Sequence, residues 1–192
     1  MAEVRLRLSD DHEAVSEVLE QLLAALENKD VQTSHARLDL LWARLAVHIR
    51  AEHLHLFPAV MDRVAESDLN EAQEIVKNLR ADHDFFMHEL ARAIGVLREL
   101  PNTTDNENKL AAVANTVREV EERLATHNEI EENQIYRWSS TLLSDSEQME
   151  LLTRINAELE NRPPRFSAQA WGNKSSPKQA TLFNRSTLSD QG

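Results

Sequence analysis

Residues 48–57 read HIRAEHLHLF, and residues 127–136 repeat this arrangement as HNEIEENQIY. Both stretches begin with histidine, carry glutamate at the fifth position and end in an aromatic residue. The first and fifth residues are the pairs His48/Glu52 and His127/Glu131. Side chains four residues apart project from one face of an α-helix, with a rise of about 6 Å between them. If both stretches are helical, each pair can therefore grip one cation or bridge two.

The surrounding sequence favours helices throughout residues 1–160. Only Gly95, Pro58 and Pro101 interrupt this part of the chain, and apolar residues recur at steps of three and four without strand-like alternation. The pattern predicts four long helices that begin at Ser9 or Asp10, at Thr33 or Ser34, after Ser67 and Asp68, and near Asp105. We expect Pro58 to mark a kink or a restart and Pro101 to end the third helix.

A fifth, shorter helix is predicted from Ser144, because Ser144 followed by Glu147 fits a capping box. Four long amphipathic helices joined by short polar links indicate an all-α protein. Their apolar seams predict an antiparallel up-down four-helix bundle, in which each seam faces a common axis. We assign residues 1–160 to this bundle domain.

The composition changes near Asn161. Residues 161–192 contain three of the five prolines and two of the three glycines, and five basic residues stand against one acidic residue. This extended C-terminal tail is therefore basic, although the whole chain has a net charge of −12, and it cannot bury much apolar surface by itself. We expect a flexible or draped extension with four side chains able to dock on an acidic neighbour: Phe166, Trp171, Leu182 and Phe183.

Six polar residues occupy seam positions that the pattern otherwise fills with Leu, Val or Ile. They are His12, His48, Glu52, His83, His127 and Glu131. A buried carboxylate is costly unless it is paired or bound to metal, and no Lys or Arg shares these seams. A buried polar network without metal is the alternative, but unpaired buried carboxylates are rarely tolerated. Imidazole and carboxylate ligands without thiolates suit iron, manganese or zinc.

The residues around these positions repeat as well. Leu8-Ser-Asp-Asp-His12 aligns with Leu79-Arg-Ala-Asp-His83, which predicts two similar halves related by a pseudo-two-fold axis through the site. Each half then offers two histidines and one glutamate, enough for two metal ions with two nitrogens each and two bridging carboxylates. A bridging oxide or hydroxide leaves each ion about five-coordinate, with a position open for a small ligand.

The four motifs His, His-x3-Glu, His and His-x3-Glu, in this order, resemble the HHE cation-binding pattern of hemerythrin-like proteins. The likeness spans about residues 8–138 and includes Leu-Phe-Pro after the first glutamate. The resemblance implies an antiparallel four-helix bundle holding a non-haem di-iron centre that handles dioxygen, nitric oxide, peroxide or iron itself. The choice of two iron ions comes from this resemblance, because the same ligands accept manganese.

The sequence departs from the oxygen-carrying hemerythrins at two points. Carriers place a second histidine four residues after the third-helix histidine, where this chain has Met87, and His88 lies about 100° further around the helix. Carriers also place an Asp five residues after the last histidine, whereas here Glu131 lies four residues after His127. The four-histidine site thus resembles the nitric-oxide-responsive and iron-centre-repair branch, although that branch often adds a Cys-bearing segment that this chain lacks.

Side chains next to the six residues have predicted roles too. His53 should point about 100° away from Glu52 and lie at the surface, whereas His55 could rejoin the seam as a hydrogen-bond partner or replace the missing histidine. Tyr136 either packs in the core, like Phe57, or donates a hydrogen bond or proton to a bound oxygen species. We expect an apolar wall around the site from Leu45, Phe86, Met87 and Leu124.

These observations favour a protein that binds, senses or scavenges dioxygen, nitric oxide or peroxide at an open iron position. One alternative is a di-iron enzyme, a nitric oxide reductase, peroxidase or iron-centre repair protein. It would need an external electron donor, because the chain has no Cys and no flavin motif. Another is an interaction module whose fold depends on iron and whose basic tail contacts an acidic partner.

Charge and hydropathy limit the partners. The net charge of −12 argues against nucleic acid, and neither a signal peptide nor a spanning helix is encoded. We therefore expect a cytoplasmic protein with a small-molecule ligand, no nucleic-acid or membrane partner, and a redox or protein partner reached through the basic tail.

Overall fold

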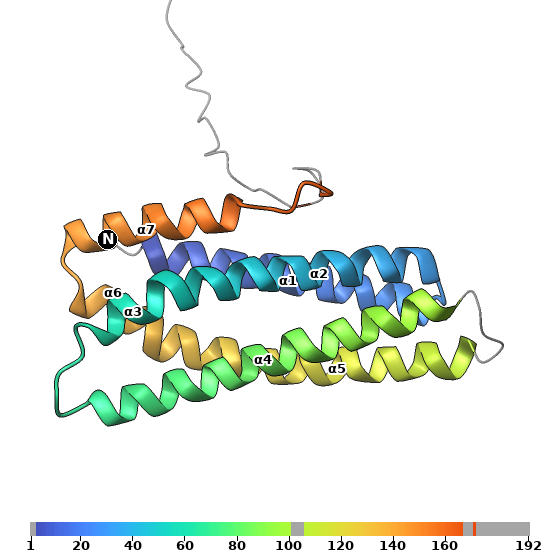
Figure 1. Ribbon diagram of the computed structural model, residues 1–192, viewed down its shortest axis with the longest axis horizontal. Helices are drawn as coiled ribbons and strands as arrows, with labels where there is room; N and C mark the ends of the chain where they lie inside the picture. Colours follow the sequence, from blue (N-terminus) through green and yellow to red (C-terminus); the bar gives the residue numbers. More distant parts are fainter. Residues whose placement is uncertain (1–2, 101–105, 167–170, 172–192) are drawn as a thin grey trace, which may run out of the picture.

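The computed structural model describes residues 3–100, 106–166 and 171, and this part of the chain is helical without strands. Four long helices run alongside one another, with successive helices in opposite directions (Figure 1). They are α1 (Glu3–Glu27), α2 (Val31–Ala51), α4 (Leu69–Glu99) and α5 (Asn106–Ile130). Because α1 and α4 each contact both α2 and α5, the four helices close into the predicted all-α bundle.

The second and fourth long helices each continue through one turn of π-helix. α2 passes into η1 (Glu52–Leu56) and α3 (Phe57–Met61), and α5 passes into η3 (Glu131–Ile135) and α6 (Tyr136–Leu142). In these turns the Phe57 N–H donates to the Glu52 carbonyl and the Tyr136 N–H to the Glu131 carbonyl, five residues back. Pro58 lies at the start of α3, where a missing N–H is tolerated, so it marks a restart after the π-helical turn.

The first helix begins earlier than the sequence pattern predicts. α1 is already helical at Glu3, so Ser9 and Asp10 lie inside it and neither caps it. Val4 and Leu8 are buried in the core, and this burial favours the additional turns over a start at a polar residue. The predicted cap is therefore wrong.

The second helix also begins earlier than predicted. Asp30 is its N-cap and accepts the Thr33 N–H at 3.0 Å, so Thr33 and Ser34 lie within the helix rather than before it. Lys29, just before the cap, has a positive φ of 56° and turns the chain between α1 and α2. The third long helix begins after Asp68, as predicted. The predicted stop at Pro101 lies outside the described residues.

The fifth helix, α7 (Asp145–Glu160), packs on α1 and α2 (Figure 1). It begins with the predicted capping box: the Ser144 hydroxyl accepts the Glu147 N–H, and the Glu147 carboxylate accepts the Ser144 N–H at 2.8 Å. Its buried face contains Leu151, Ile155 and Leu159. α7 thus covers the half of the bundle that contains the N-terminal helix pair.

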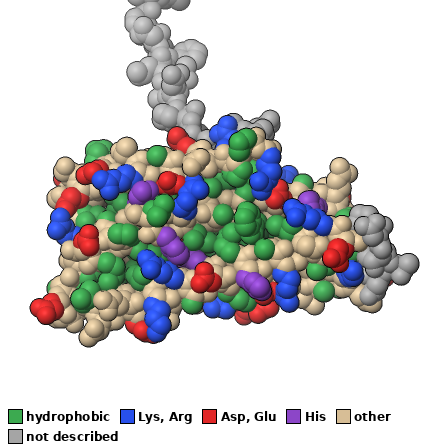
Figure 2. Space-filling model, viewed as in Figure 1, with side chains coloured by type: hydrophobic (Ala, Val, Ile, Leu, Met, Phe, Trp, Pro, Cys, Tyr) green, Lys and Arg blue, Asp and Glu red, His purple; other side chains and the backbone are tan. Residues whose placement is uncertain are grey.

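Figure 2 shows acidic, basic and hydrophobic side chains interspersed over one face of the bundle. None of the described helices combines the length and apolar character that a bilayer-spanning segment requires. Inside the bundle, the buried polar side chains include all six polar seam residues of the sequence analysis. The other buried polar side chains of the described residues are Asp11, Ser34, Arg44 and Ser139.

Candidate metal centre

The structure brings the six polar seam residues together from six different elements. They are His12 on α1, His48 on α2, Glu52 in η1, His83 on α4, His127 on α5 and Glu131 in η3. None is more than 6% exposed, and both glutamates are fully buried. The two π-helical turns begin at the two glutamates, so each carboxylate projects from the point where the helix changes its hydrogen-bond pattern.

The ligand-type atoms of these residues form two adjoining groups. The first group comprises His12, His48, Glu52 and Glu131, and the second comprises His83, His127 and Glu131. Within each group the candidate atoms lie within 4.8 Å of one another. Bonds of about 2 Å from a metal to nitrogen or oxygen place opposite ligands about 4 Å apart, so each group is close enough to surround one ion. Glu131 is common to both groups.

Each glutamate presents one carboxylate oxygen to each half of the molecule. The distances from carboxylate oxygen to ring nitrogen are 3.3 Å for Glu131 Oε2 to His12 Nε2, 3.1 Å for Glu131 Oε1 to His127 Nε2, 3.3 Å for Glu52 Oε1 to His48 Nε2 and 3.4 Å for Glu52 Oε2 to His83 Nε2. A carboxylate that faces two sets of nitrogens in this way has the arrangement of a bridging ligand.

All four histidines have a neighbouring side chain at their outer ring nitrogen, Nδ1. The pairs are His12 with Glu132 at 3.1 Å, His48 with Asp11 at 3.0 Å, His83 with His53 at 2.9 Å and His127 with Asp82 at 3.2 Å. Partners at this position fix the orientation of an imidazole and leave its other nitrogen, Nε2, for a metal. All four Nε2 atoms accordingly turn toward the glutamates.

These four outer partners are not among the site residues that the sequence predicts. Asp11 and Asp82 occupy the same position of the repeated motif, immediately before the first histidine of each half. The repeat therefore indicates that the two aspartates have equivalent roles. A regular α-helix places His53 at the surface, but its side chain is only partly exposed. The π-helical turn that begins at Glu52 changes the angle between successive side chains, and His53 reaches His83.

Charge pairing shifts the pKa values of several groups in the cluster. Burial alone would raise the pKa of Asp11, but its hydrogen bond with His48 and the charges of His48 and Arg44 lower it to about 2. Burial would lower the pKa of His48, but the Glu52 and Asp11 carboxylates raise it well above its ordinary value. Burial would raise the pKa of Glu131, yet the surrounding histidines hold it well below its ordinary value. The cluster thus favours anionic carboxylates surrounded by positive charge.

The inner atoms lack hydrogen bonds that buried polar atoms normally make. Glu52 Oε2, His83 Nε2 and Glu131 Oε1 are buried without a hydrogen-bond partner. The Nε2 atoms of His12 and His48 also face each other at 3.2 Å, and this contact can be a hydrogen bond only if one of the two nitrogens carries a proton. A cation among these atoms would satisfy all of them, so the residues fit a metal site.

The Tyr136 hydroxyl lies inside the cluster. It donates to Glu52 Oε1 at 2.8 Å and also lies 3.3 Å from Glu131 Oε2 and 3.0 Å from His12 Nε2. Burial and the charges of both glutamates raise the pKa of this phenol well above its ordinary value, so it stays protonated and acts as a donor. The equivalent residue of the first half, Phe57, has no hydroxyl, and the two halves therefore differ here.

A small cavity of about 10 Å³ lies beside the four histidines. Its other lining residues are Val15, Leu45, Ile49, Leu124 and Asn128. Leu45 and Leu124 are thus part of the wall, as predicted, but Phe86 and Met87 are not. Phe86 packs edge-on against the ring of the candidate ligand His127, at a centroid distance of 5.3 Å, although it does not line this cavity.

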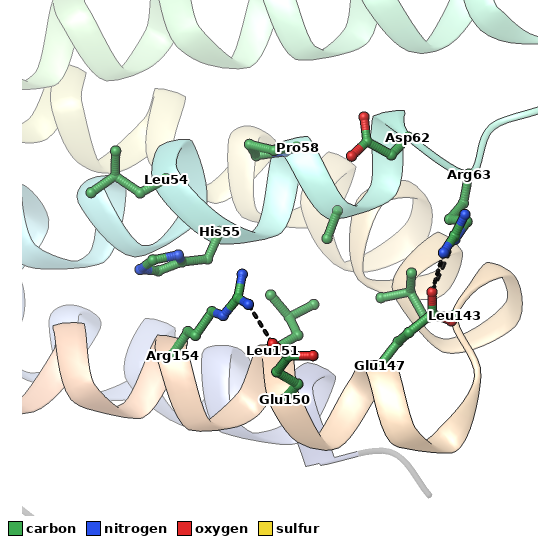
Figure 3. A pocket seen from close by; sticks show the side chains of 11 residues that line it. Leu54, His55, Pro58, Asp62, Arg63, Leu143, Glu147, Glu150, Leu151 and Arg154 are labelled. Atoms are coloured by element: carbon green, nitrogen blue, oxygen red, sulfur yellow. Dashed lines mark hydrogen bonds and ion pairs between the residues drawn. The ribbon is translucent and has the colours of Figure 1, made fainter.

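His55 lies away from the cluster. Figure 3 shows it at a surface pocket of about 260 Å³ between α7 and the segment formed by η1 and α3. Its Nε2 lies 3.9 Å from the Glu158 carboxylate of α7, and Arg63 and Glu147 form an ion pair at the other end of the pocket. The predicted possibility that His55 replaces the missing histidine is therefore wrong, while His88 is exposed as predicted.

The fold and the buried cluster together define the class of the molecule, a helical-bundle protein with a site for cations. Residues 6–139 match the family model described as the hemerythrin HHE cation binding domain. The chain belongs to the hemerythrin family, as the order and spacing of its histidines and glutamates predict. No curated protein and no solved structure matches the chain.

Proposed function

We propose that this chain is a non-haem di-iron protein that binds, senses or scavenges dioxygen, nitric oxide or peroxide. The proposed ligands are His12, His48, Glu52, His83, His127 and Glu131, with an oxide or hydroxide between the two ions. Membership of the hemerythrin family favours iron, although manganese and zinc accept the same ligands. We assign residues 1–160 to the metal-binding domain and residues 161–192 to a basic tail.

The placement of the two glutamates carries this proposal. Each turns one oxygen toward the histidines of α1 and α2 and the other toward those of α4 and α5. Two ions bridged by two carboxylates need this arrangement, whereas one ion would need only one of the two groups. A dinuclear centre therefore accounts for the whole cluster.

The surroundings of the cluster favour a very small ligand. The adjoining cavity, of about 10 Å³, is close to the minimum for a single water molecule, so a ligand of a few atoms would fill it. Iron supplies electrons and open coordination positions for such a ligand when it is bound. The apolar part of the cavity wall limits the entry of bulk water, and the Tyr136 hydroxyl, which does not line the cavity, would hold a proton at the two glutamates.

Anaerobic loading with ferrous iron tests this function. We expect two ions per chain, followed by a change in the absorption spectrum when separate samples receive air, nitric oxide or peroxide. Loading of two ions without a spectral change in any of the three samples would reject the ligand-binding role. Failure to load two ions would reject the dinuclear centre itself.

Replacing Tyr136 with phenylalanine should leave the two ions bound but weaken retention of the small ligand. A hydrogen bond to a charged group contributes about 1.5 kcal/mol, which corresponds to about tenfold faster ligand release. Rapid-mixing absorption measurements on the iron-loaded variant would detect this change. An unchanged release rate in a variant that still holds two ions would mean that the phenol does not face the ligand.

The position of the Tyr136 hydroxyl, which donates a hydrogen bond to Glu52 inside the cluster, also favours a second candidate, a di-iron enzyme such as a nitric oxide reductase, a peroxidase or an iron-centre repair protein. A proton donor beside the ions is what a reductive reaction requires. Such an enzyme needs an external electron donor, since the chain has no Cys. Multiple turnovers with added reductant would favour the enzyme, and a single binding event would favour the sensor or scavenger.

A further inference from the structure

A chain of polar contacts leads outward from the candidate ligand His48. Asp11 Oδ2 lies 3.0 Å from His48 Nδ1, and the other oxygen of this carboxylate accepts a hydrogen bond from Arg44 at 2.6 Å. Arg44 lies four residues before His48, one turn back on α2. The arginine therefore fixes the aspartate, and the aspartate fixes the ring of the candidate ligand.

The second half of the molecule repeats this chain of contacts. Asp82 Oδ2 lies 3.2 Å from His127 Nδ1, and Asp82 Oδ1 accepts a hydrogen bond from Arg123 at 2.7 Å. Arg123 again lies four residues before the histidine. The repeat places the same three residue types at the same spacing in both halves, so each half provides a natural control for the other.

The two chains of contacts differ in their exposure to water. The side chains of Arg44 and Asp11 are 5% and 8% exposed, whereas those of Arg123 and Asp82 are 43% and 19% exposed. Charges interact more strongly where water is excluded, because water no longer screens them. The ion pair in the first half is therefore expected to hold its histidine more rigidly than the ion pair in the second.

Trp171 packs over the buried series of contacts that links Arg44, Asp11 and His48 in the first half. Its carbonyl accepts a hydrogen bond from Arg44, and the guanidinium carbon lies 5.4 Å from the centre of the indole rings. The indole N–H donates to the Leu159 carbonyl of α7 at 3.2 Å, and the side chain is only 3% exposed. In the second half, by contrast, Arg123 stacks on Phe85 of the bundle itself.

Trp171 lies beyond residues 6–139, the part of the chain that matches the family model. We propose that Trp171, Arg44 and Asp11 are positioning residues for the ion held by His12 and His48, and that Trp171 makes this position release its ion more slowly than the position of His83 and His127. The inference rests on the proposed dinuclear centre. It gives the tail a function that the family's metal-binding motif does not supply.

The first test uses the full-length protein without metal. In the wild type, the Nδ1 proton of His48 should be protected from exchange with water and visible by proton–nitrogen NMR, because Asp11 and Arg44 are buried and Trp171 packs on Arg44. Trp171→Ala should cause loss of this signal, while the Nδ1 signal of His127 persists. Retention of the His48 signal in Trp171→Ala would overturn the inference, whatever the metal content of the protein.

The second test measures release of the two ions from the loaded protein to a chelator. We expect two phases in the wild type and acceleration of only the slower phase in Trp171→Ala, by about tenfold, the lower end of the effect of altering an outer hydrogen-bond partner. Equal acceleration of both phases, or of neither, would overturn the inference. A wild type that takes up no ions would instead reject the proposed function, and the NMR result would still decide the positioning role.

Three further variants serve as controls. Trp171→Phe keeps an aromatic ring packed on Arg44 and should retain the slow phase. Because phenylalanine lacks the indole N–H, this variant distinguishes the effect of packing on Arg44 from the effect of the hydrogen bond to Leu159. Arg44→Gln should reproduce the effect of Trp171→Ala, whereas Arg123→Gln should affect only the faster phase. If Trp171→Ala proves unfolded by circular dichroism, Arg44→Gln decides the question, and an unchanged slow phase in that variant would count against the proposal.

Discussion

Replacing Glu131 with alanine is expected to abolish binding of both metal ions, reducing the metal content from two ions per chain to none. Glu131 belongs to both groups of candidate ligands, and its two oxygens face His12 in one half and His127 in the other. Without it, the second group retains only two imidazoles, and the first loses one of its two carboxylates. Elemental analysis of protein loaded with iron and then desalted would measure the loss.

Two nearby acidic residues provide matched controls for this variant. Glu129 is exposed, so Glu129→Gln should still hold two ions. Glu132 contacts only the outer nitrogen of His12 within the cluster, so Glu132→Gln should keep the stoichiometry but weaken affinity by about 10–100-fold. Two ions retained by Glu131→Ala would show that the carboxylate does not bridge.

The candidate site was predictable because its residues violate the helical pattern around them. Histidine and glutamate at seam positions stand out where Leu, Val and Ile are expected, and the structure buries every one of them. The i,i+4 spacing of His48 and Glu52 fixed their common face before any tertiary contact was known. The bundle followed from the same periodicity, since an apolar seam on each helix must be buried against the others.

The features that the sequence does not predict, namely the position of His53 and the start of α1, depend on departures from regular helix geometry and on tertiary contacts. The α-helical angle of about 100° per residue places His53 at the surface, but the π-helical turn at Glu52 brings it to His83. Nothing in a single sequence marks such a turn. The start of α1 was missed because burial of Val4 and Leu8 outweighs the preference of Ser9 for a cap position.

The tail also makes a tertiary contact that the sequence does not predict. Trp171 was expected to dock on an acidic neighbour because the tail is basic. Arg165 of the tail does pair with Asp39 of α2, but Trp171 itself packs on Arg44. The positive charge of Arg44 is already compensated by Asp11, which comes from another helix. A pairing between residues 33 positions apart cannot be inferred from local charge patterns, so the sequence predicted that Trp171 docks but not that it contacts Arg44. Leu182 and Phe183 lie outside the described residues.

Removal of the metal ions should strongly destabilise the fold. The six candidate ligands come from both halves of the bundle, and a ligand that binds only the folded state stabilises it by about 4 kcal/mol at a free concentration 1,000 times its Kd. In a domain of this size, each ion lost would lower Tm by about 10 °C. Thermal unfolding followed by circular dichroism, with and without a chelator, would measure the shift.

The same experiment separates a structural role of the metal from an effect of the chelator. In Glu131→Ala the chelator should leave Tm unchanged, because that variant is expected to hold no ion at the outset. The metal-free wild type retains two fully buried glutamates, whose remaining compensation is positive charge on the surrounding histidine rings and the hydrogen bond from the Tyr136 hydroxyl. A wild-type Tm that does not respond to the chelator would mean that this compensation already suffices, and that the ions bind to a bundle which folds fully without them.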